Sequence, residues 1–197
     1  MAERSHAIEA QPQRGGHLRT VEAAWYDGPA SRREARGRRV ARDLVELSRL
    51  EHGYEQAQRT PVDLARLLRS VCADYPKLRV AGPDQLPLRT DPRRLARVLS
   101  VLLDNACLHG APPVSVRYDA DAIQISDGGP GLDPRLLARA TEPFVTGARA
   151  RGRGVGLGLA IAARQATLLG AELRLRNAEG GGAIAELHFA AVDSSSP

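Results

Sequence analysis

One stretch of the sequence, beginning at Asp91 and Pro92, constrains the fold more than any other. Asp is a favoured residue type just before a helix, and Pro fits the first helical position. The apolar residues that follow recur three or four positions apart, as on one face of an α-helix; they are Leu95, Val98, Leu99, Leu102, Leu103 and Ala106. Such an apolar stripe is stable only when it is buried, so the chain must place a second layer of structure against this helix.

The remaining patterns supply that layer. Extended segments bounded by turn residues are predicted at residues 77–80, 85–88, 114–118, 122–126, 172–177 and 183–189. Further helices are predicted at residues 32–52, 61–71, 136–140 and 157–169. For the second of these, Thr60 is the predicted cap and Pro61 the first helical residue. Together the patterns predict an α/β two-layer sandwich, a mixed sheet of about five strands backed by three main helices, with an N-terminal helical hairpin.

The predicted organisation is one core domain with an appendage. Residues 55–191 form the core domain, residues 1–54 a degenerate or shortened helical region, and residues 192–197 a disordered tail. The helical region carries a narrow apolar stripe among charges, made of Val40, Leu44, Leu47 and Leu50. A stripe of this kind needs a partner helix, from within the chain or from a second copy.

Composition and charge disfavour several classes of function. No apolar run approaches the roughly 18 residues of a membrane span, and the N-terminus lacks the apolar core of a signal peptide, so we expect a cytoplasmic protein. Cys72 and Cys107 fall in apolar helical patterns, which favours buried free thiols over a disulfide. The net charge is +5, but Lys77 is the only lysine and aromatic residues make up 4% of the chain, so direct nucleic-acid binding is disfavoured.

Four glycines at every second position lead into the last predicted helix: Gly152, Gly154, Gly156 and Gly158. Glycine lets a backbone approach an anion closely and adopt positive φ, and the free N–H groups at the start of a helix favour negative charge. This arrangement is typical of a phosphate-binding loop, and glycine pairs also serve in plain loops. Neither G-x-x-x-x-G-K-[ST] nor G-x-G-x-x-G after a strand is present, so the two most familiar nucleotide motifs are excluded.

Two further segments carry polar residues where a site would need them. Asn105 and His109 are four residues apart at the edge of the apolar stripe that follows Pro92. Asn105 could bond to neighbouring backbone, or it could be an oxygen ligand for Mg²⁺, which needs few protein ligands when phosphates and water supply the rest. The segment Asp127–Gly131 follows a predicted strand. One interpretation is an ordinary turn. The other is a base-binding loop, in which the Asp127 carboxylate accepts a hydrogen bond from an exocyclic amine and the glycines leave room for a flat base.

The order and spacing of these motifs resemble the N, G1, F and G2 boxes of the histidine-kinase ATP-binding domain. That domain belongs to the superfamily shared with gyrase, Hsp90 and the mismatch-repair ATPases. The matching segments are Asn105 on its helix, Asp127–Gly131, Glu142–Phe144 and Gly152–Ile161. The resemblance extends over residues 40–190 and includes Asp43–Glu51, which looks like the end of the second dimerisation helix of these kinases. It implies a Bergerat-type ATP-binding fold.

By this resemblance the cofactors are ATP and Mg²⁺. Asn105 would bind Mg²⁺, and Asp127 would accept a hydrogen bond from the adenine amino group, with Gly129 and Gly131 making room for the base. His109 would lie near the phosphates. The residues that would wrap the phosphates at the base of a mobile lid are Gly154, Val155, Gly156, Leu157, Gly158 and Leu159.

The implied lid also contains Arg149, Arg151 and Arg153. These side chains would either neutralise charge that develops on the γ-phosphoryl group or remain solvated in the loop. Phe144 would either plug the lid hinge or contact the nucleotide.

Two departures from the family pattern bear on the reaction. Val101 stands where superfamily members that hydrolyse ATP carry Glu to activate water, and where many histidine kinases have a second Asn. Leu108 stands where Lys is common. The missing Glu favours donation of the phosphoryl group over hydrolysis, and the lost polar contacts weaken the expected affinity for Mg²⁺ or nucleotide.

The phosphoacceptor is the larger gap, because no stretch matches the S-H-E-L-R-T-P motif of these kinases. The nearest segment, His17–Val21, lacks the Glu and has Val for Pro. The resemblance implies a two-component kinase that transfers the γ-phosphoryl group to His17 or to a histidine on a separate phosphotransfer protein. A response regulator would be a further partner, and residues 32–52 would form a homodimer. The alternatives are a non-catalytic regulatory module that docks through its apolar stripe, and an ATPase or serine kinase of the same superfamily.

Overall fold

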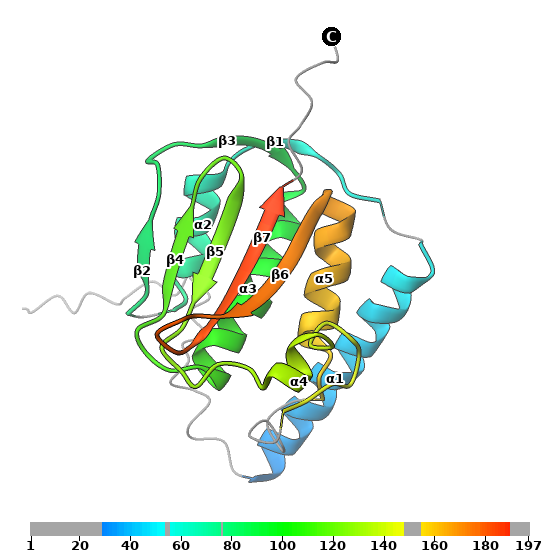
Figure 1. Ribbon diagram of the computed structural model, residues 1–197. Coiled ribbons are helices and arrows are strands. Elements are labelled where there is room, and N and C mark those ends of the chain that lie inside the picture. The colour runs from blue at the N-terminus through cyan, green and yellow to red at the C-terminus, as the bar shows by residue number, and fades with distance from the viewer. Residues whose placement is uncertain (1–28, 54–55, 76, 148–154, 190–197) are drawn as a thin grey trace, which may run out of the picture.

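The computed structural model describes residues 29–53, 56–75, 77–147 and 155–189. Within these ranges the chain forms helices α1 to α5 and strands β1 to β7, arranged mainly in two layers (Figure 1). The first arm of the predicted hairpin lies outside the described ranges. The predicted site residues and segments that also lie outside them are His17, Arg149, Arg151, Gly152, Arg153, Gly154 and residues 192–197.

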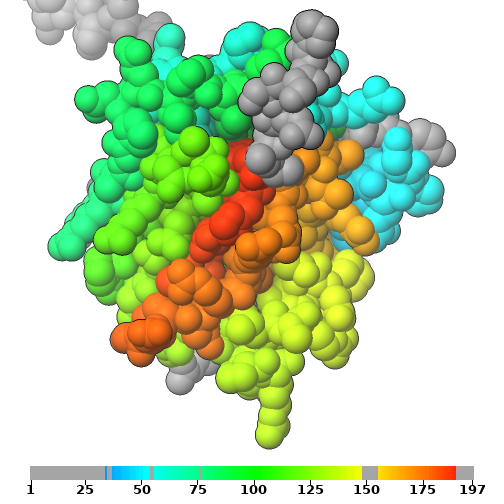
Figure 2. Space-filling view, turned by 45° about the horizontal axis from the view of Figure 1, so that its top comes forward, coloured from blue at the N-terminus to red at the C-terminus, as the bar shows by residue number. Residues whose placement is uncertain are grey.

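The main sheet has five strands in the order β2-β4-β5-β7-β6. Their bounds are β2 Arg79–Ala81, β4 Ser115–Tyr118, β5 Ala122–Ser126, β6 Ala171–Asn177 and β7 Ala183–Phe189. β2 runs parallel to β4, and every other neighbouring pair is antiparallel, so the sheet is mixed as predicted. Figure 2 looks onto its outer face, where β5, β7 and β6 lie side by side with no helix in front of them.

Three helices cover the inner face of this sheet: α2 (Leu64–Cys72), α3 (Pro92–His109) and α5 (Gly158–Leu169). α3 begins as predicted, since the Asp91 carboxylate accepts hydrogen bonds from the first backbone N–H groups of the helix. α5 ends at Gly170, which is left-handed with a φ of 72°. The largest fully buried side chains come from these helices and from alternate positions of the central strands: Leu64, Leu68, Leu95, Val98, Leu99, Leu102, Leu103, Val116, Ile123, Ile125, Ile161 and Leu187. The predicted two-layer α/β sandwich is thereby confirmed.

α1 (Pro29–Glu51) packs along α5 at the edge of the two layers (Figure 1). Its contact with α5 is a second, smaller apolar cluster whose buried members are Leu47, Leu50, Leu157, Ala160 and Ile161. Leu44 and Val45 on the same helix are 41% and 52% exposed. Only part of the predicted stripe on α1 therefore finds its partner inside the described chain.

A cluster of charges fixes α1 beside α3. The Arg97 guanidinium donates to Glu46 Oε2 from Nη2 at 2.8 Å and from Nε at 3.1 Å, and to Asp43 Oδ1 at 2.9 Å. The Gln165 amide on α5 donates to Glu46 Oε1 at 3.0 Å. Burial lowers the pKa of Arg97, but Glu46 and Asp43 outweigh that effect and raise it above its ordinary value. Glu46 thus joins three helices.

Several local predictions were wrong. Residues Thr60–Asp63 are strand β1, not the start of a helix, and the helix cap is Asp63, whose Oδ1 accepts from Ala65 N at 3.1 Å and from Leu86 N at 3.0 Å. β1 pairs with β3 (Pro87–Thr90) in a separate ribbon outside the main sheet, and β3 lies two residues beyond the predicted strand at 85–88. Pro61 is compatible with a strand because a two-stranded ribbon leaves one edge of β1 unpaired.

Two smaller corrections concern α4 and a cysteine. α4 is a single turn, Pro134–Leu137, capped by Asp133, where a helix at 136–140 was predicted. Cys72 is a buried free thiol as expected, whereas Cys107 is exposed, because it follows the inward-facing Ala106 by one residue and therefore turns away from the core. None of the helices in the described ranges is both long and apolar enough to cross a membrane.

Candidate functional site

The elements that carry the described site residues come together at one end of the sandwich (Figure 1). α3 and α5 run in opposite directions, so the last turn of α3 and the first turn of α5 lie at the same end. The segment after β5 reaches this end too, because Asp127 N donates to Ala183 O at the start of β7 and Gly128 N donates to Ala111 O just beyond α3. Four segments that are distant in sequence therefore meet there.

Asp127 sits against backbone on several sides. Its Oδ1 accepts from Gly129 N at 2.8 Å, and the described residues supply no hydrogen bond to Oδ2. A Cβ on Gly110 would come within 2.6 Å of Asp127 Cβ, and a Cβ on Gly129 would lie 2.8 Å from Asp127 Oδ1. A Cβ on Gly182 would overlap the Asp127 carbonyl group. These glycines allow three segments to close around one half-buried carboxylate, which can still accept a hydrogen bond from an amino group.

Asn105 lies one turn before the end of α3, half-buried, and its side chain makes no hydrogen bond to the residues that the structure describes. The alternative of an amide bonded to neighbouring backbone is therefore not what the geometry shows. His109 is the last residue of α3 and is exposed. No group of three or more His, Cys, Asp or Glu side chains that could hold a metal occurs among the described residues. An Asn oxygen that is free to coordinate suits Mg²⁺ bound mainly by phosphate oxygens and water.

Val101 places a buried apolar side chain at the position where related ATPases carry Glu. Its side chain is 8% exposed, and its Cγ1 lies 3.4 Å from the point that a Cβ on Gly158 would occupy, at the start of α5. Leu108, the other departure from the family pattern, is 51% exposed. No carboxylate is present at position 101 to activate a water molecule beside the first turn of α5.

The base of the predicted lid is a backbone crossing between residues 144–146 and 155–157. Phe144 N donates to Gly156 O at 2.9 Å, and a Cβ on Gly156 would lie 2.5 Å from Val145 O. Gly156 has a φ of 74°, and Phe144 itself has a φ of 66° with its ring 60% exposed. Phe144 is therefore not part of the apolar core, and the two roles expected for it, plugging the lid hinge or contacting the nucleotide, stay predictions.

The first turn of α5 presents backbone rather than side chains. Its N-cap residue, Leu157, makes no side-chain capping bond, and among the described residues no acceptor is bonded to the first N–H groups of the helix. The side chain of Leu157 is buried in the α1–α5 cluster, Val155 packs against the same cluster, and Leu159 packs against the main core. Contact of these three residues with phosphates would therefore come from their backbone.

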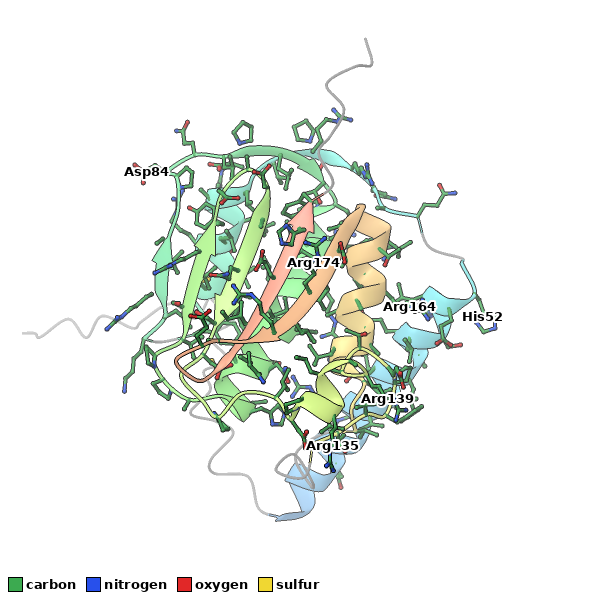
Figure 3. The ribbon with its side chains drawn as sticks, viewed as in Figure 1. His52, Asp84, Arg135, Arg139, Arg164 and Arg174 are labelled. Carbon is green, nitrogen blue, oxygen red and sulfur yellow. The ribbon has the colours of Figure 1, made fainter. Side chains whose placement is uncertain are left out.

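Figure 3 shows Arg135 and Arg139 at this same end of the molecule, around α4. Arg139 is paired with Glu142, to which Nε and Nη2 donate at 2.9 and 2.7 Å. This bond lowers the pKa of Glu142. Glu142 in the third motif is thus engaged with Arg139, one helical turn away in sequence.

Two contributors to this end of the molecule were not found from the sequence. Gly110 ends α3 and Asn177 ends β6, and each touches the Asp127–Gly131 segment across a long sequence separation. Glycine after a helix reads as an ordinary cap, and Asn at a strand end reads as an ordinary turn residue.

Comparison with protein families matches residues 90–192 to the model described as Histidine kinase-, DNA gyrase B-, and HSP90-like ATPase. The chain belongs to this family. The match covers more than half of the 197 residues and includes all four expected boxes. The family predicted from the order of the motifs is therefore confirmed.

Among curated proteins, the chain is similar to Sensor protein CseC of Streptomyces avermitilis, 41% identical over 148 residues, and to CseC of Streptomyces coelicolor, 42% identical over 152 residues. These matches take in 74% and 76% of the chain but 30% of each relative, so the chain spans less than a third of their length. A further similar protein is the signal transduction histidine-protein kinase AfsQ2 of Streptomyces coelicolor, 32% identical over 160 residues, covering 76% of the chain and 30% of that protein.

Solved structures give the same result for the fold. The chain is similar to full-length ShkA in complex with AMPPNP, with a TM-score of 0.61, 26% identity, and coverage of 75% of this chain and 35% of that one. It is also similar to the ATP-binding domain of PrrB from Mycobacterium tuberculosis, with a TM-score of 0.53, 29% identity, and coverage of 66% and 96%.

Proposed function

We propose that the chain is the ATP-binding kinase part of a two-component signalling system and transfers the γ-phosphoryl group of ATP to a histidine. The observation that carries this proposal is the meeting of Asp127, Asn105 and the uncapped start of α5 at one end of the fold. Asp127 offers a carboxylate oxygen to an amino group, and α5 offers N–H groups to phosphates. An adenine nucleotide carries both partners.

The residues present fit ATP and Mg²⁺. Asn105 would hold the metal, and Mg²⁺ when bound would neutralise charge on the phosphate oxygens. Asp127 would orient the base, while the backbone around Gly156 and Gly158 would position the phosphates. Arg149, Arg151 and Arg153 would supply further positive charge toward the γ-phosphoryl group.

Val101 supports donation over hydrolysis. A buried valine cannot accept a proton from water, and it lies against the helix whose first turn would bind phosphate. ATPase and serine-kinase functions that depend on a carboxylate at this position are correspondingly disfavoured. Transfer then requires an acceptor histidine, which is His17 or a histidine of a separate phosphotransfer protein.

The partners follow from the same proposal. A response regulator would receive the phosphoryl group in turn. The exposed Leu44 and Val45 on α1 support a homodimer through residues 32–52, since two apolar side chains remain uncovered by the described chain. The site of action would be the cytoplasm.

The test is incubation of the full chain with γ-labelled ATP and Mg²⁺, alone and with candidate histidine phosphotransfer proteins. We expect acid-labile label on a histidine, and loss of more than 90% of it in Asn105→Ala. Arg93→Ala, an exposed change on the same helix, is the matched control and should retain it. Label that survives in His17→Gln excludes His17, and label that appears only on a second protein establishes transfer in trans. A chain that binds no ATP at millimolar concentration refutes the kinase proposal and favours a non-catalytic docking module.

A further inference from the structure

The segment Asp127–Gly131 is held in place by few bonds after its first residues. Asp127, Gly128 and Gly129 each have a backbone N–H that is bonded, to Ala183 O, to Ala111 O and to the Asp127 carboxylate. Beyond Gly129, the next hydrogen bonds in the described chain are two at Leu132. The hydrogen bonds at Leu132 are therefore the ones that fix the backbone of the second half of the loop.

Both bonds at Leu132 come from one side chain, Asn177, at the end of β6. Asn177 Oδ1 accepts from Leu132 N at 2.8 Å, and Asn177 Nδ2 donates to Leu132 O at 2.8 Å. An amide that satisfies the N–H and the C=O of one residue imitates a β-ladder pair and fixes that residue in position and orientation. The two residues are 45 positions apart in sequence.

The fit between Asn177 and the loop also depends on Gly131. Gly131 has a φ of 75°, and a Cβ there would lie 2.7 Å from Asn177 Oδ1 and 3.1 Å from Gly182 O. The loop backbone thus lies directly on the amide and on the turn between β6 and β7. Gly182 in the same turn lies against the Asp127 carbonyl, so one hairpin contacts the loop at both ends.

We propose that Asn177 is a positioning residue for adenine recognition, which holds Leu132 and Gly131 so that the loop after Asp127 presents a fixed surface to the base. This inference rests on the proposed ATP-binding function. Asn177 touches neither the base nor the phosphates in this scheme; it acts through the loop backbone. Its effect should therefore fall on discrimination between adenine and other bases.

The experiment measures the affinity of the full chain for ATP and for GTP by calorimetry. We expect Asn177→Ala to weaken ATP binding about tenfold, because two hydrogen bonds that order the loop are lost. GTP, which lacks the amino group at the same place, should bind with little change, so the ATP-to-GTP ratio falls. Asn177→Asp keeps an acceptor for Leu132 N–H but faces the Leu132 carbonyl with a carboxylate, and should give an intermediate ratio.

A second variant tests the same contact from the loop side. Gly131→Ala should lower the ATP-to-GTP ratio as Asn177→Ala does, since its Cβ would displace the amide. Glu179→Ala, an exposed change in the same hairpin, is the control and should bind both nucleotides like the wild type. Hydrogen exchange at the Leu132 amide in the nucleotide-free chain should accelerate in Asn177→Ala while the midpoint of global unfolding stays the same.

The outcomes separate the two proposals. A wild-type chain that binds no ATP overturns the proposed function and the positioning role with it. Wild-type binding combined with an unchanged ATP-to-GTP ratio in Asn177→Ala overturns the positioning role alone. Equal losses for ATP and GTP, together with a lower unfolding midpoint, would identify a purely structural residue and would also overturn it.

Discussion

Replacing Gly182 with alanine is expected to destabilise the protein strongly, because this residue meets two separate constraints. Its φ of 93° lies where residues with a Cβ are strained. A Cβ would also overlap the carbonyl oxygen of Asp127 and lie 2.9 Å from its carbonyl carbon. Both atoms belong to the backbone, so rotation of a side chain cannot relieve the overlap.

The two preceding glycines separate these effects. Gly181 has the same φ of 93°, but its nearest atom would be 3.7 Å away, and Gly180 has nothing within 4 Å and no positive φ. Backbone strain of this kind is worth about 1–3 kcal/mol, and overpacking adds about 1–3 kcal/mol. We therefore expect no measurable loss of the free energy of unfolding in Gly180→Ala, a loss of about 1–2 kcal/mol in Gly181→Ala, and a loss of about 3–5 kcal/mol in Gly182→Ala.

Urea unfolding followed by far-ultraviolet circular dichroism measures the series, with the slope of the transition checked for constancy. The order of the three variants matters more than the absolute values. If Gly182→Ala lost no more stability than Gly181→Ala, the turn would be able to move away from Asp127. Close packing of this turn could then not be what fixes the carboxylate.

Two further predictions concern charge. A double-mutant cycle on Arg97 and Glu46 should give a coupling free energy of about 1–2 kcal/mol, because the contact is bidentate and partly buried. The exposed pair Arg38 and Glu34 is the control and should give less than about 0.5 kcal/mol. Equal coupling energies for the two pairs would contradict the idea that Arg97 fixes α1. Burial raises the pKa of Asp91, but hydrogen bonds from the backbone of Gln58 and of the residues that Asp91 caps lower this pKa overall below its ordinary 3.8. The ionised carboxylate therefore contributes its full stabilisation of the fold above pH 3.8 and loses it as the pH falls through the lower pKa of the folded state. Urea midpoints measured from pH 6 to pH 2.5 should fall less steeply in Asp91→Asn than in the wild type, and parallel profiles would show that Asp91 carries none of this pH dependence.

The elements that sequence patterns located well are those whose signals are local. The helix after Asp91 has a cap, a proline and a long apolar period, and the helix before Gly170 ends at a left-handed glycine. At Thr60 and Pro61 the local signals were ambiguous, because a cap followed by proline also fits a short strand. Pairing with β3, across sequence separations of 24 to 30 residues, makes Thr60–Asp63 a strand, and Asp63 caps the helix that follows.

In the candidate site, too, the residues found from the sequence are those with local signals, and the ones missed depend on tertiary contacts. Asn105, Asp127 and the glycines were recognisable because each stands in an ordered motif. Asn177 was not, because its role depends on a contact with Leu132 that only the closed sheet creates. The exposure of Leu44 on α1, in contrast to the burial of Leu47, also escaped prediction, since a helical period marks a face without showing how far a neighbouring helix covers it.

The two described glycines of the run that leads into α5, Gly156 and Gly158, meet different physical requirements. Gly156 is fixed by its positive φ and by backbone atoms from Phe144 and Val145, so any side chain there would push these two backbone segments apart. Gly158 has ordinary backbone and only Val101 at 3.4 Å, so packing alone would tolerate a small side chain. What distinguishes Gly158 is its place in the uncapped first turn of α5, where a bare backbone exposes its N–H groups. Steric contact therefore requires glycine at Gly156, whereas the described contacts do not require it at Gly158, where the proposed binding of phosphate would account for it.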